Sequence, residues 1–330
     1  MKIIFRKENA IRFSDTELVK NKTIIPLETT DHSLIYANPS VRKDGENLFV
    51  FSNYSASPIL RFDTKGNFMN TIGRIGNGPG EYTGITDVFV HAKKEYVEVL
   101  SDKMIQRYAY DGKSLEPLPV DLPAFSFVHT DDGYWFYGGN NKMYSPYRLF
   151  QTDSSGHAVR EYLTDDSEML PMMETNFGNG ACLTFWESLY HKIYHITNDS
   201  LKLSHTIEFP GLEIPADAHK MPPMEVIPYL KRFHYATIRC YLENQKYVYL
   251  MVIENKGDDM PAIYHWFINK RNRRETLIQT DLVMDSYLLS PQLLTEENGL
   301  YYIGYPIESR DEEVNPDSNP SVVMIDLSDL

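Results

Sequence analysis

Length, composition and charge already exclude several classes of protein. The chain has 330 residues, of which 42% are hydrophobic and 24% charged, as is ordinary for a soluble folded protein. Its formal net charge of -14 argues against nucleic acid or an anionic membrane as partner, because both are bound mainly through Lys and Arg. Tyrosine is frequent, with 23 residues, and aromatic side chains suit the half-buried surfaces of β-sheets.

The amino terminus contains only a short apolar run, Ile3, Ile4 and Phe5, before charged residues interrupt it. Such a run is too short for a signal peptide or a membrane span. We therefore predict no membrane span. The protein is expected to be extracytoplasmic, periplasmic or at the cell surface, if an export signal has been removed, and cytoplasmic otherwise.

A strand followed by a polar turn recurs six times along the chain. The copies begin at Ile59, Ile105, Tyr147, Lys192, Ile263 and Val322, and the first ends in the turn Asp63-Thr-Lys-Gly66. Strand-rich repeats of roughly 40 to 50 residues are typical of propeller blades. No Pro/Gly/Ser-rich linker divides the sequence. We predict an all-β protein with a single domain over residues 1–330, a six-bladed β-propeller of four-stranded antiparallel blades.

The predicted blades follow one another with short turns between their strands. Blade 1 is expected to have strands at 34–41, 48–52, 59–63 and 68–72, and blade 2 at 85–90, 96–100, 105–110 and 115–120. Turns containing Asp-Gly or Asp-x-x-Gly suit tight hairpins, because Gly tolerates a positive φ. The six blades are predicted to span residues 34–72, 85–120, 125–163, 170–209, 235–280 and 288–327.

An insertion interrupts this rhythm before blade 5, at residues 210–234. Pro222 and Pro223 precede an apolar stretch that can form a short helix from Met224, since Pro is accepted at a first helical turn. Pro228 should limit the length of this helix. The insertion is either a lid or a packed surface loop, and we favour the loop.

Blade 6 lacks a fourth strand, since the chain ends after the strand predicted at 322–327. Residues 23–28 are strand-like and precede blade 1. A propeller must join its first and last blades without leaving an unpaired edge. Pro26 is tolerated in an outermost strand, where its missing amide hydrogen is not needed. We predict that residues 23–28 form the outer strand of blade 6.

A glycine-rich segment connects blades 1 and 2. It contains Gly73, Gly76, Gly78, Pro79, Gly80 and Glu81. Nucleotide-binding glycine loops open a helix, whereas Pro79 and Thr83 here lead into another strand. The segment therefore indicates a turn between blades, which Glu81 and Tyr82 are expected to fix by hydrogen bonds.

This glycine segment, the Phe62-Asp-Thr-Lys-Gly66 turn before it and the Tyr110-Asp-Gly112 turn after it resemble NHL-like six-bladed propellers of Bacteroidetes, most of which have no known function. The opening Ile25-Pro-Leu-Glu-Thr29 is also similar. The resemblance covers nearly the whole chain. It implies an exported protein, often a lipoprotein, although this sequence has neither an export signal nor a lipobox cysteine.

No metal-ligand motif emerges from the sequence. Cys182 and Cys240 are too few for a cysteine-rich zinc site and are expected to be buried thiols, with a disulfide as the alternative. His191 and His195 would be about 13 Å apart on a strand, too far for one ion. Acidic runs at 165–168, 258–259 and 311–313 are expected to be solvated loops, with calcium binding as the alternative. We predict no metal and no cofactor.

Loop length indicates which face of the propeller carries the function. Connections from a second to a third strand and from one blade to the next are long, at 52–58, 138–146, 254–262, 308–320 and 210–234, and these connections share one face. Functional residues concentrate on long loops over a rigid scaffold. The candidate ligand-binding residues on this long-loop face are Tyr54, Arg74, Tyr82, Tyr144, Tyr147, Trp186 and Tyr190.

Aromatic residues and Arg are those most used in recognition. We therefore predict a monomeric binding propeller for a protein or carbohydrate ligand. The alternative is a propeller enzyme of the lactonase or lyase type, with a cation or histidines on the channel axis. A cytoplasmic scaffold is a third option. The sequence contains no Gly-x-Ser-x-Gly nucleophile motif.

Overall fold

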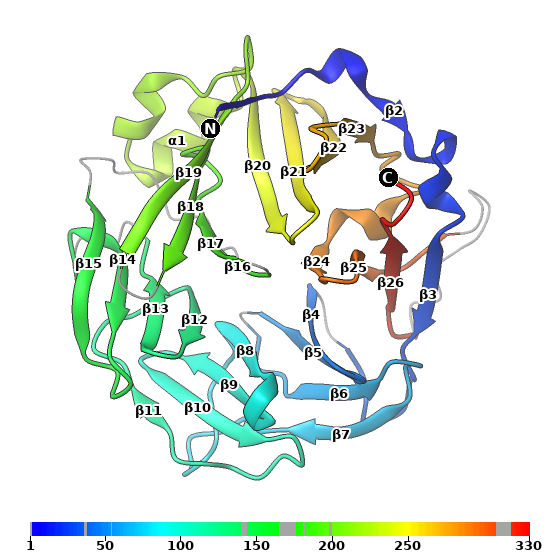
Figure 1. Cartoon of the computed structure of the whole chain (residues 1–330). Helices are drawn as coiled ribbons and strands as arrows, with labels where there is room; N and C mark the ends of the chain where they lie inside the picture. The colour runs from blue at the N-terminus through cyan, green and yellow to red at the C-terminus, as the bar shows by residue number, and fades with distance from the viewer. Residues whose placement is uncertain are drawn as a thin grey trace.

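The computed structural model describes residues 2–35, 38–53, 55–139, 144–164, 176–180, 182–197, 200–307 and 318–330. Within these ranges, six sheets stand in a ring around a central channel, one sheet per blade (Figure 1). The consecutive strands of each blade are antiparallel neighbours, and the first strand of the blade is innermost. The predicted six-bladed β-propeller is confirmed.

The strands of the first three blades follow the predicted order. They are β4 (Pro39–Asp44), β5 (Asn47–Ser52), β6 (Ile59–Asp63) and β7 (Phe68–Ile72) in blade 1, β8 (Asp87–His91), β9 (Tyr96–Ser101), β10 (Met104–Ala109) and β11 (Leu118–Pro119) in blade 2, and β12 (Ser126–Thr130), β13 (Gly133–Tyr137), β14 (Tyr147–Thr152) and β15 (Ala158–Thr164) in blade 3.

The last three blades have the same arrangement. They contain β16 (Phe177–Asn179), β17 (Leu183–Trp186), β18 (Lys192–Thr197) and β19 (Ser200–Glu208) in blade 4, β20 (His234–Glu243), β21 (Tyr247–Lys256), β22 (Asp259–Asn269) and β23 (Glu275–Gln279) in blade 5, and β24 (Pro291–Leu294), β25 (Gly299–Gly304) and β26 (Ser321–Asp326) in blade 6.

Three predicted boundaries are wrong for identifiable reasons. The first strand of blade 1 is β4, not 34–41, because its hairpin pairs Asp44 with Asn47 and so shifts the strand toward the turn. The outer strand of blade 2 shrinks from 115–120 to two residues, where Pro117 and Pro119 have no amide hydrogen to donate. The connection predicted at 254–262 is a hairpin, since Lys256 pairs with Asp259.

The ring closes through the amino-terminal segment, as predicted. The strand β3 (Lys22–Pro26) pairs antiparallel with β26, with Pro26 opposite Ser321 and Lys22 opposite Ile325. Pro26 is the last residue of this outermost strand. Residues 23–28 therefore lie at the predicted edge, although the paired part ends at Pro26.

The sequence did not indicate two further strands in the amino-terminal segment. The strand β1 (Lys2–Ile4) pairs in parallel with β19 of blade 4, and β2 (Ile11–Arg12) pairs in parallel with β23 of blade 5. Figure 1 shows this segment, in dark blue, running along the outer edges of blades 4, 5 and 6. It thus covers three blade edges that would otherwise be open to pairing with other chains.

The insertion before blade 5 is a packed surface element. Its helix α1 (Pro223–Leu230) begins one residue before the predicted start and continues through Pro228 for two residues. Ala218, Val226 and Leu230 are buried together in a small cluster of their own. In the described part of the chain, no helix is long and apolar enough to cross a membrane.

The glycine-rich segment forms the expected turn between β7 and β8. The amide of Gly78 donates to Glu81 Oε2 at 2.8 Å, and the amide of Tyr82 donates to the carbonyl oxygen of Arg74 at 3.0 Å. A Cβ on Gly76 would collide with the Glu81 carboxylate, and Gly73 has a φ of +75° with its Cα facing the Tyr82 ring. The turn is thus fixed by Glu81 and Tyr82; Pro79 is exposed, and Gly80 is half-buried.

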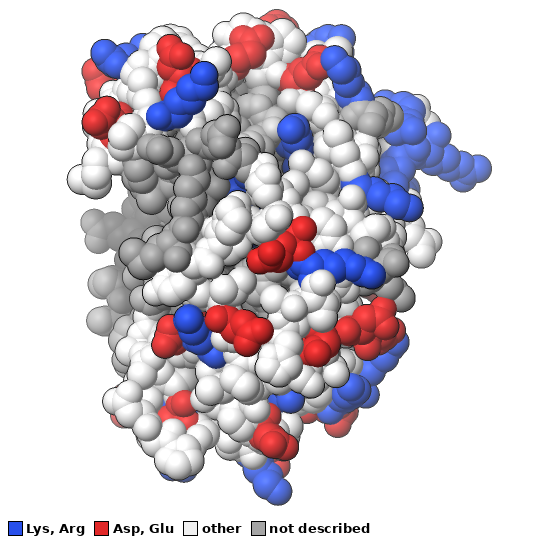
Figure 2. Space-filling view, turned by 90° about the vertical axis from the view of Figure 1, so that its left-hand side faces the viewer, with Lys and Arg blue, Asp and Glu red and all other residues white. Residues whose placement is uncertain are grey.

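On one side of the ring, charged side chains of both signs are spread over the surface. Figure 2 shows one side of the ring, on which acidic side chains are scattered among basic and uncharged ones. This distribution agrees with the thin spread of the acidic excess along the sequence. The acidic runs at 165–168 and 311–313 lie outside the described residues, and Asp258 and Asp259 lie exposed at the hairpin between β21 and β22.

Candidate functional site in the central channel

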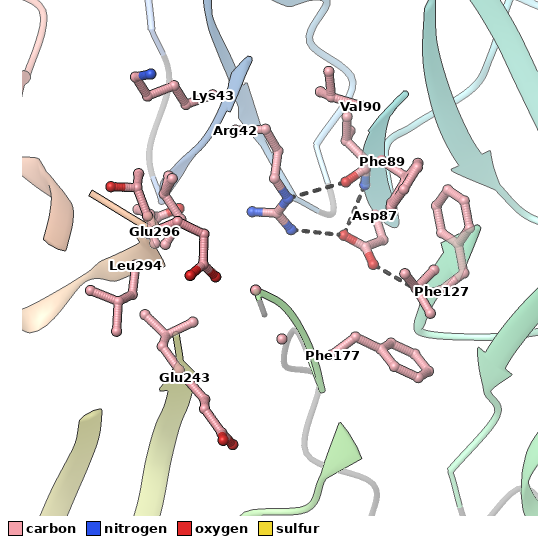
Figure 3. Close-up of a pocket in the computed structure, with 18 of the residues that line it drawn as sticks. Arg42, Lys43, Asp87, Phe89, Val90, Phe127, Phe177, Glu243, Leu294 and Glu296 are labelled. Carbon is pink, nitrogen blue, oxygen red and sulfur yellow. Dashed lines mark hydrogen bonds and ion pairs between the residues drawn. The ribbon is translucent and has the colours of Figure 1, made fainter. Parts of the chain in front are cut away.

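The innermost strands of all six blades enclose a cavity of about 450 Å³ in the channel (Figure 3). Inner strands enter from the long-loop face and end in the short turns to the second strands. Asp87, Phe127 and Phe177 stand near the beginnings of their strands, whereas Glu243 and Glu296 stand at or beyond the ends. The cavity therefore extends from an inner part near the long-loop face to a mouth on the opposite face, which we call the short-turn face.

An ion pair between Arg42 and the buried Asp87 lines the inner cavity. Arg42 Nη2 lies 3.2 Å from Asp87 Oδ1, and Arg42 Nε donates to the carbonyl oxygen of Val88 (Figure 3). Asp87 also accepts hydrogen bonds from the amides of Val88 and Phe127, at 2.8 and 3.0 Å. Burial raises the pKa of Asp87 against the opposing effect of Arg42. Because these groups come from blades 1, 2 and 3, the pair joins three blades.

The mouth carries more accessible polar groups. Gln245 and Glu296 are exposed, Lys43 and Thr295 are half-buried, and all four line the cavity. The amide of Gln245 donates to Glu296 Oε2 at 3.3 Å, which links the inner hairpins of blades 5 and 6. These side chains offer a cation, a carboxylate, an amide and a hydroxyl to a ligand that enters from this face.

Glu243 lies at the edge of the mouth and is heavily hydrogen-bonded. Its Oε1 accepts from Lys270 Nζ at 2.6 Å, and its Oε2 accepts from the Tyr241 hydroxyl at 2.6 Å and lies 3.2 Å from His195 Nε2. Burial alone would raise the pKa of Glu243, but the hydrogen bonds from Lys270 and Tyr241 outweigh it, so the pKa is lowered. The carboxylate therefore stays ionised although it is buried.

A second buried carboxylate, Glu98, joins blades 2 and 3. It lies 3.0 Å from Arg107 Nε and 2.9 Å from His129 Nδ1, and it accepts from the Tyr134 hydroxyl at 2.7 Å. Burial alone would raise the pKa of Glu98, but the contacts with His129 and Tyr134 outweigh it, so the pKa is lowered. His129 is thus part of an interblade network that no sequence motif marks.

Two of the seven candidate binding residues lie in the core. Tyr82 and Trp186 are each 2% exposed. Tyr82 packs edge-on against Tyr108, and Trp186 belongs to the apolar cluster between blades 4 and 5. Neither can contact a ligand on the surface, so both are withdrawn as candidates. Tyr54 lies outside the described residues.

The other four candidates are at least partly accessible on the long-loop face. Arg74 is exposed, Tyr144 is 50% exposed and lies under Lys103 Nζ, and Tyr147 is half-buried at the start of β14. Tyr190 alone lines a cavity, a groove of about 540 Å³ between the outer strands of blade 4 and the insertion.

This groove contains charged and aromatic groups. The Tyr190 ring packs against the Arg148 guanidinium at 4.4 Å and against the His219 ring at 5.5 Å. His191 lies beside it, edge-on to Phe209, and burial lowers the pKa of His191 to about 4. His195 instead approaches Glu243. His191 and His195 therefore have different surroundings.

The two cysteines, Cys182 and Cys240, form no disulfide.

A ring of six blades, each with four antiparallel strands, around a ligand-sized channel defines the chain as a six-bladed β-propeller. The chain belongs to the family described as a domain of unknown function, DUF4934, which matches residues 3–325. No curated protein matches the sequence. The expected propeller fold is thus confirmed, whereas the NHL-like label and a restriction to Bacteroidetes stay predictions.

Solved structures resemble the chain in fold. A protein of Bacteroides fragilis, described as a predicted exported protein, is 15% identical with a TM-score of 0.77, covering 98% of this chain and 99% of that one. The WD40 domain of Neurospora crassa Pan2 is 9% identical with a TM-score of 0.49, covering 94% and 96%. BamB of Moraxella catarrhalis is 8% identical with a TM-score of 0.46, covering 92% and 100%. At 15% identity, the likeness to the Bacteroides fragilis protein shows the fold alone.

Proposed function

We propose that the protein is a binding propeller that holds a carbohydrate ligand in the mouth of its central channel. The observation that carries this proposal is the cavity of about 450 Å³ that all six inner strands line. Ligand pockets commonly occupy about 300 to 1,000 Å³. The cavity is therefore large enough for one or a few sugar rings but not for a folded domain.

The chemistry of the lining favours a polyhydroxylated ligand. Glu296, Gln245 and Thr295 at the mouth can donate to or accept from sugar hydroxyls. Phe89, Phe127 and Phe177 also line the cavity, but Phe127 and Phe177 are only 3% and 8% exposed, so they contribute apolar wall rather than open ring faces. Arg42 is already paired with Asp87, so the cavity does not offer an unopposed guanidinium to an anionic ligand.

Substitutions at the mouth test this proposal. A glycan array would first identify an oligosaccharide that binds, and Glu296→Gln and Gln245→Ala should then each weaken that binding about tenfold, because each removes a hydrogen bond to the ligand. Glu297→Gln is the matched control, since Glu297 is the neighbouring exposed carboxylate and does not line the cavity. Equal losses in Glu297→Gln and Glu296→Gln would contradict a site in the channel.

A protein ligand on the long-loop face is the second candidate. It is supported by the groove at Tyr190 and by the half-exposed ring of Tyr144. A peptide array distinguishes the two candidates. Binding that survives Glu296→Gln and Gln245→Ala but is lost in Tyr144→Ala would move the site to the long-loop face.

An enzyme of the lactonase or lyase type is the alternative from another class. The carboxylates of Asp87, Glu243 and Glu296 in the channel favour it, since oxygen ligands bind calcium. Among the described residues that line the channel cavity, none is a histidine. Thermal melting with calcium and with a chelator separates the options: a melting temperature raised by calcium supports the enzyme, and an unchanged one supports the binding module.

We also propose that the protein acts outside the cytoplasm. This rests on the likeness to the Bacteroides fragilis protein described as a predicted exported protein. Immunoblotting of fractions from the source cells should then place the protein outside the cytoplasmic fraction. Recovery of the protein with a cytoplasmic marker would contradict the proposal.

A further inference from the structure

Three metal-ligating side chains from two neighbouring blades meet beside the channel mouth. Cys182 directly precedes β17, His195 lies on β18, and Glu243 is the last residue of β20. One donor atom from each, the Sγ, an imidazole nitrogen and a carboxylate oxygen, lies within 4.8 Å of the other two. In the part of the chain that the structure describes, this is the one group of three such side chains found together.

The donor set and its spacing suit zinc. Zinc binds thiolate sulfur at about 2.3 Å and imidazole nitrogen or carboxylate oxygen at about 2.0 to 2.2 Å, so donor atoms around a tetrahedral ion stand about 3.3 to 3.8 Å apart. His195 Nε2 and Glu243 Oε2 are 3.2 Å apart, which is close to that spacing. The Cys182 sulfur takes no part in the contact between His195 and Glu243, yet it lies within 4.8 Å of a donor atom of each.

Neighbouring groups hold the carboxylate in place. Lys270 Nζ donates to Glu243 Oε1 at 2.6 Å and to the carbonyl oxygen of Asn244 at 3.0 Å. The Tyr241 hydroxyl donates to Glu243 Oε2 at 2.6 Å, from a ring that is fully buried. Hydrogen bonds of this kind orient the ligands of protein metal sites and are needed for high affinity.

We propose that Cys182, His195 and Glu243 form a zinc site at the edge of the channel mouth. Three protein ligands leave a fourth position for water or for a ligand group, which is the arrangement of reactive zinc sites rather than of closed structural ones. Glu243 also lines the channel cavity, so the zinc site borders the proposed ligand site. The zinc site goes beyond the proposed carbohydrate binding, and its test does not depend on the outcome of the carbohydrate test.

Cobalt is the probe that tests the site, because a thiolate bound to Co²⁺ gives a charge-transfer band in the near ultraviolet. The full chain, freed of metal with a chelator, should bind one Co²⁺ with such a band, and Zn²⁺ should remove the band by displacement. Cys182→Ser should abolish the band, and His195→Ala should weaken binding at least about 100-fold. Lys270→Met, which keeps all three ligands, should weaken binding about 10- to 100-fold.

Cys240→Ser is the matched control, since Cys240 is the other cysteine of the chain and is not in the group. It should leave the band and the affinity unchanged. Glu296→Gln should do the same, which separates this proposal from carbohydrate binding. Circular dichroism verifies that each variant is folded. Absence of the band in the wild-type chain, or a band lost in Cys240→Ser and kept in Cys182→Ser, overturns the zinc site.

Discussion

His265 is the most deeply buried histidine among the described residues, at 2% exposure in blade 5. Its Nδ1 lies 2.8 Å from the Tyr249 hydroxyl and its Nε2 lies 2.7 Å from Thr280 Oγ1. Burial lowers the pKa of His265 to about 3. The folded protein therefore keeps this imidazole neutral under conditions in which the unfolded chain takes up a proton.

This difference predicts that acid destabilises the fold well before the carboxylates titrate. An unfolded histidine has a pKa of about 6.5, so below that pH the unfolded state binds one more proton than the folded state, until the pH approaches 3. Stability is fully present above about pH 6.5 and falls as the pH drops. From about pH 7.5 to pH 5, His265 alone should cost about 2 kcal/mol, measured by urea unfolding.

A substitution isolates this contribution. In His265→Gln, the loss of stability between the two pH values should be smaller than in the wild-type chain by about 2 kcal/mol, whatever the effect of the substitution at neutral pH. His157→Gln is the control, since the side chain of His157 is 71% exposed. Identical pH dependence in His265→Gln and wild type would contradict the buried neutral state.

Single residues also show the limits of sequence analysis. Glu81 and the glycines around it fix a local turn, so their role could be predicted from neighbours in sequence. Tyr82 and Trp186 could not be separated from exposed aromatic residues, because their burial depends on packing against distant residues such as Tyr108. Residues that act within a local turn are predictable, whereas the exposure of an aromatic side chain is not.

At the scale of elements, the amino-terminal segment is held by more than the predicted edge strand. Phe5 follows β1 and inserts into the core between blades 4 and 5. Its ring centroid lies 5.5 Å from that of Phe209, 5.3 Å from that of Tyr264 and 5.7 Å from that of Trp266. Phe5 is 4% exposed. It anchors a segment whose own strands are only two and three residues long.

Removing this anchor should destabilise the whole protein. Phe5→Ala leaves a cavity between two blades and is expected to lower the free energy of unfolding by about 3 to 5 kcal/mol. Ile11→Ala, in the same segment, is the control, because Ile11 is 45% exposed and its loss should cost no more than about 0.5 kcal/mol. Urea unfolding measures both. Similar values for the two variants would show that the segment does not pack against the core as described.

Strand periodicity made most elements predictable. Apolar strands that end in hairpin turns mark β5, β6 and β7 in the sequence, and the missing strand of blade 6 pointed to residues 23–28. The strands β1 and β2 are too short to show a period. Their parallel partners lie far away in the chain, since Lys2 pairs with Thr206 and Ile11 pairs with Ile278. Their pairing is a property of the closed ring.

At the scale of the whole molecule, the pairing of β3 with β26 joins the first and last parts of the chain. Deletion of residues 1–30 removes this strand together with β1 and β2 and exposes the outer edges of three blades. We expect a large fall in melting temperature and a greater tendency to aggregate, since open sheet edges pair with other chains. Differential scanning calorimetry measures the fall.

A shorter deletion serves as comparison. Removing residues 2–12 takes away β1 and β2 but leaves β3 in place, so the melting temperature should fall to an intermediate value. A melting temperature that is unchanged after deletion of residues 1–30 would contradict the closure of the ring by the amino-terminal segment.

The sequence by itself determined the repeat, the number of blades, most strands and the closing strand, because hairpins and turns depend on residues close to one another in the chain. Only the tertiary structure placed the cavity mouth on the short-turn face and brought Cys182, His195 and Glu243 together. These three lie on two blades and share no motif. In a propeller the channel is built from one strand of every blade, so its chemistry arises only when the ring is closed.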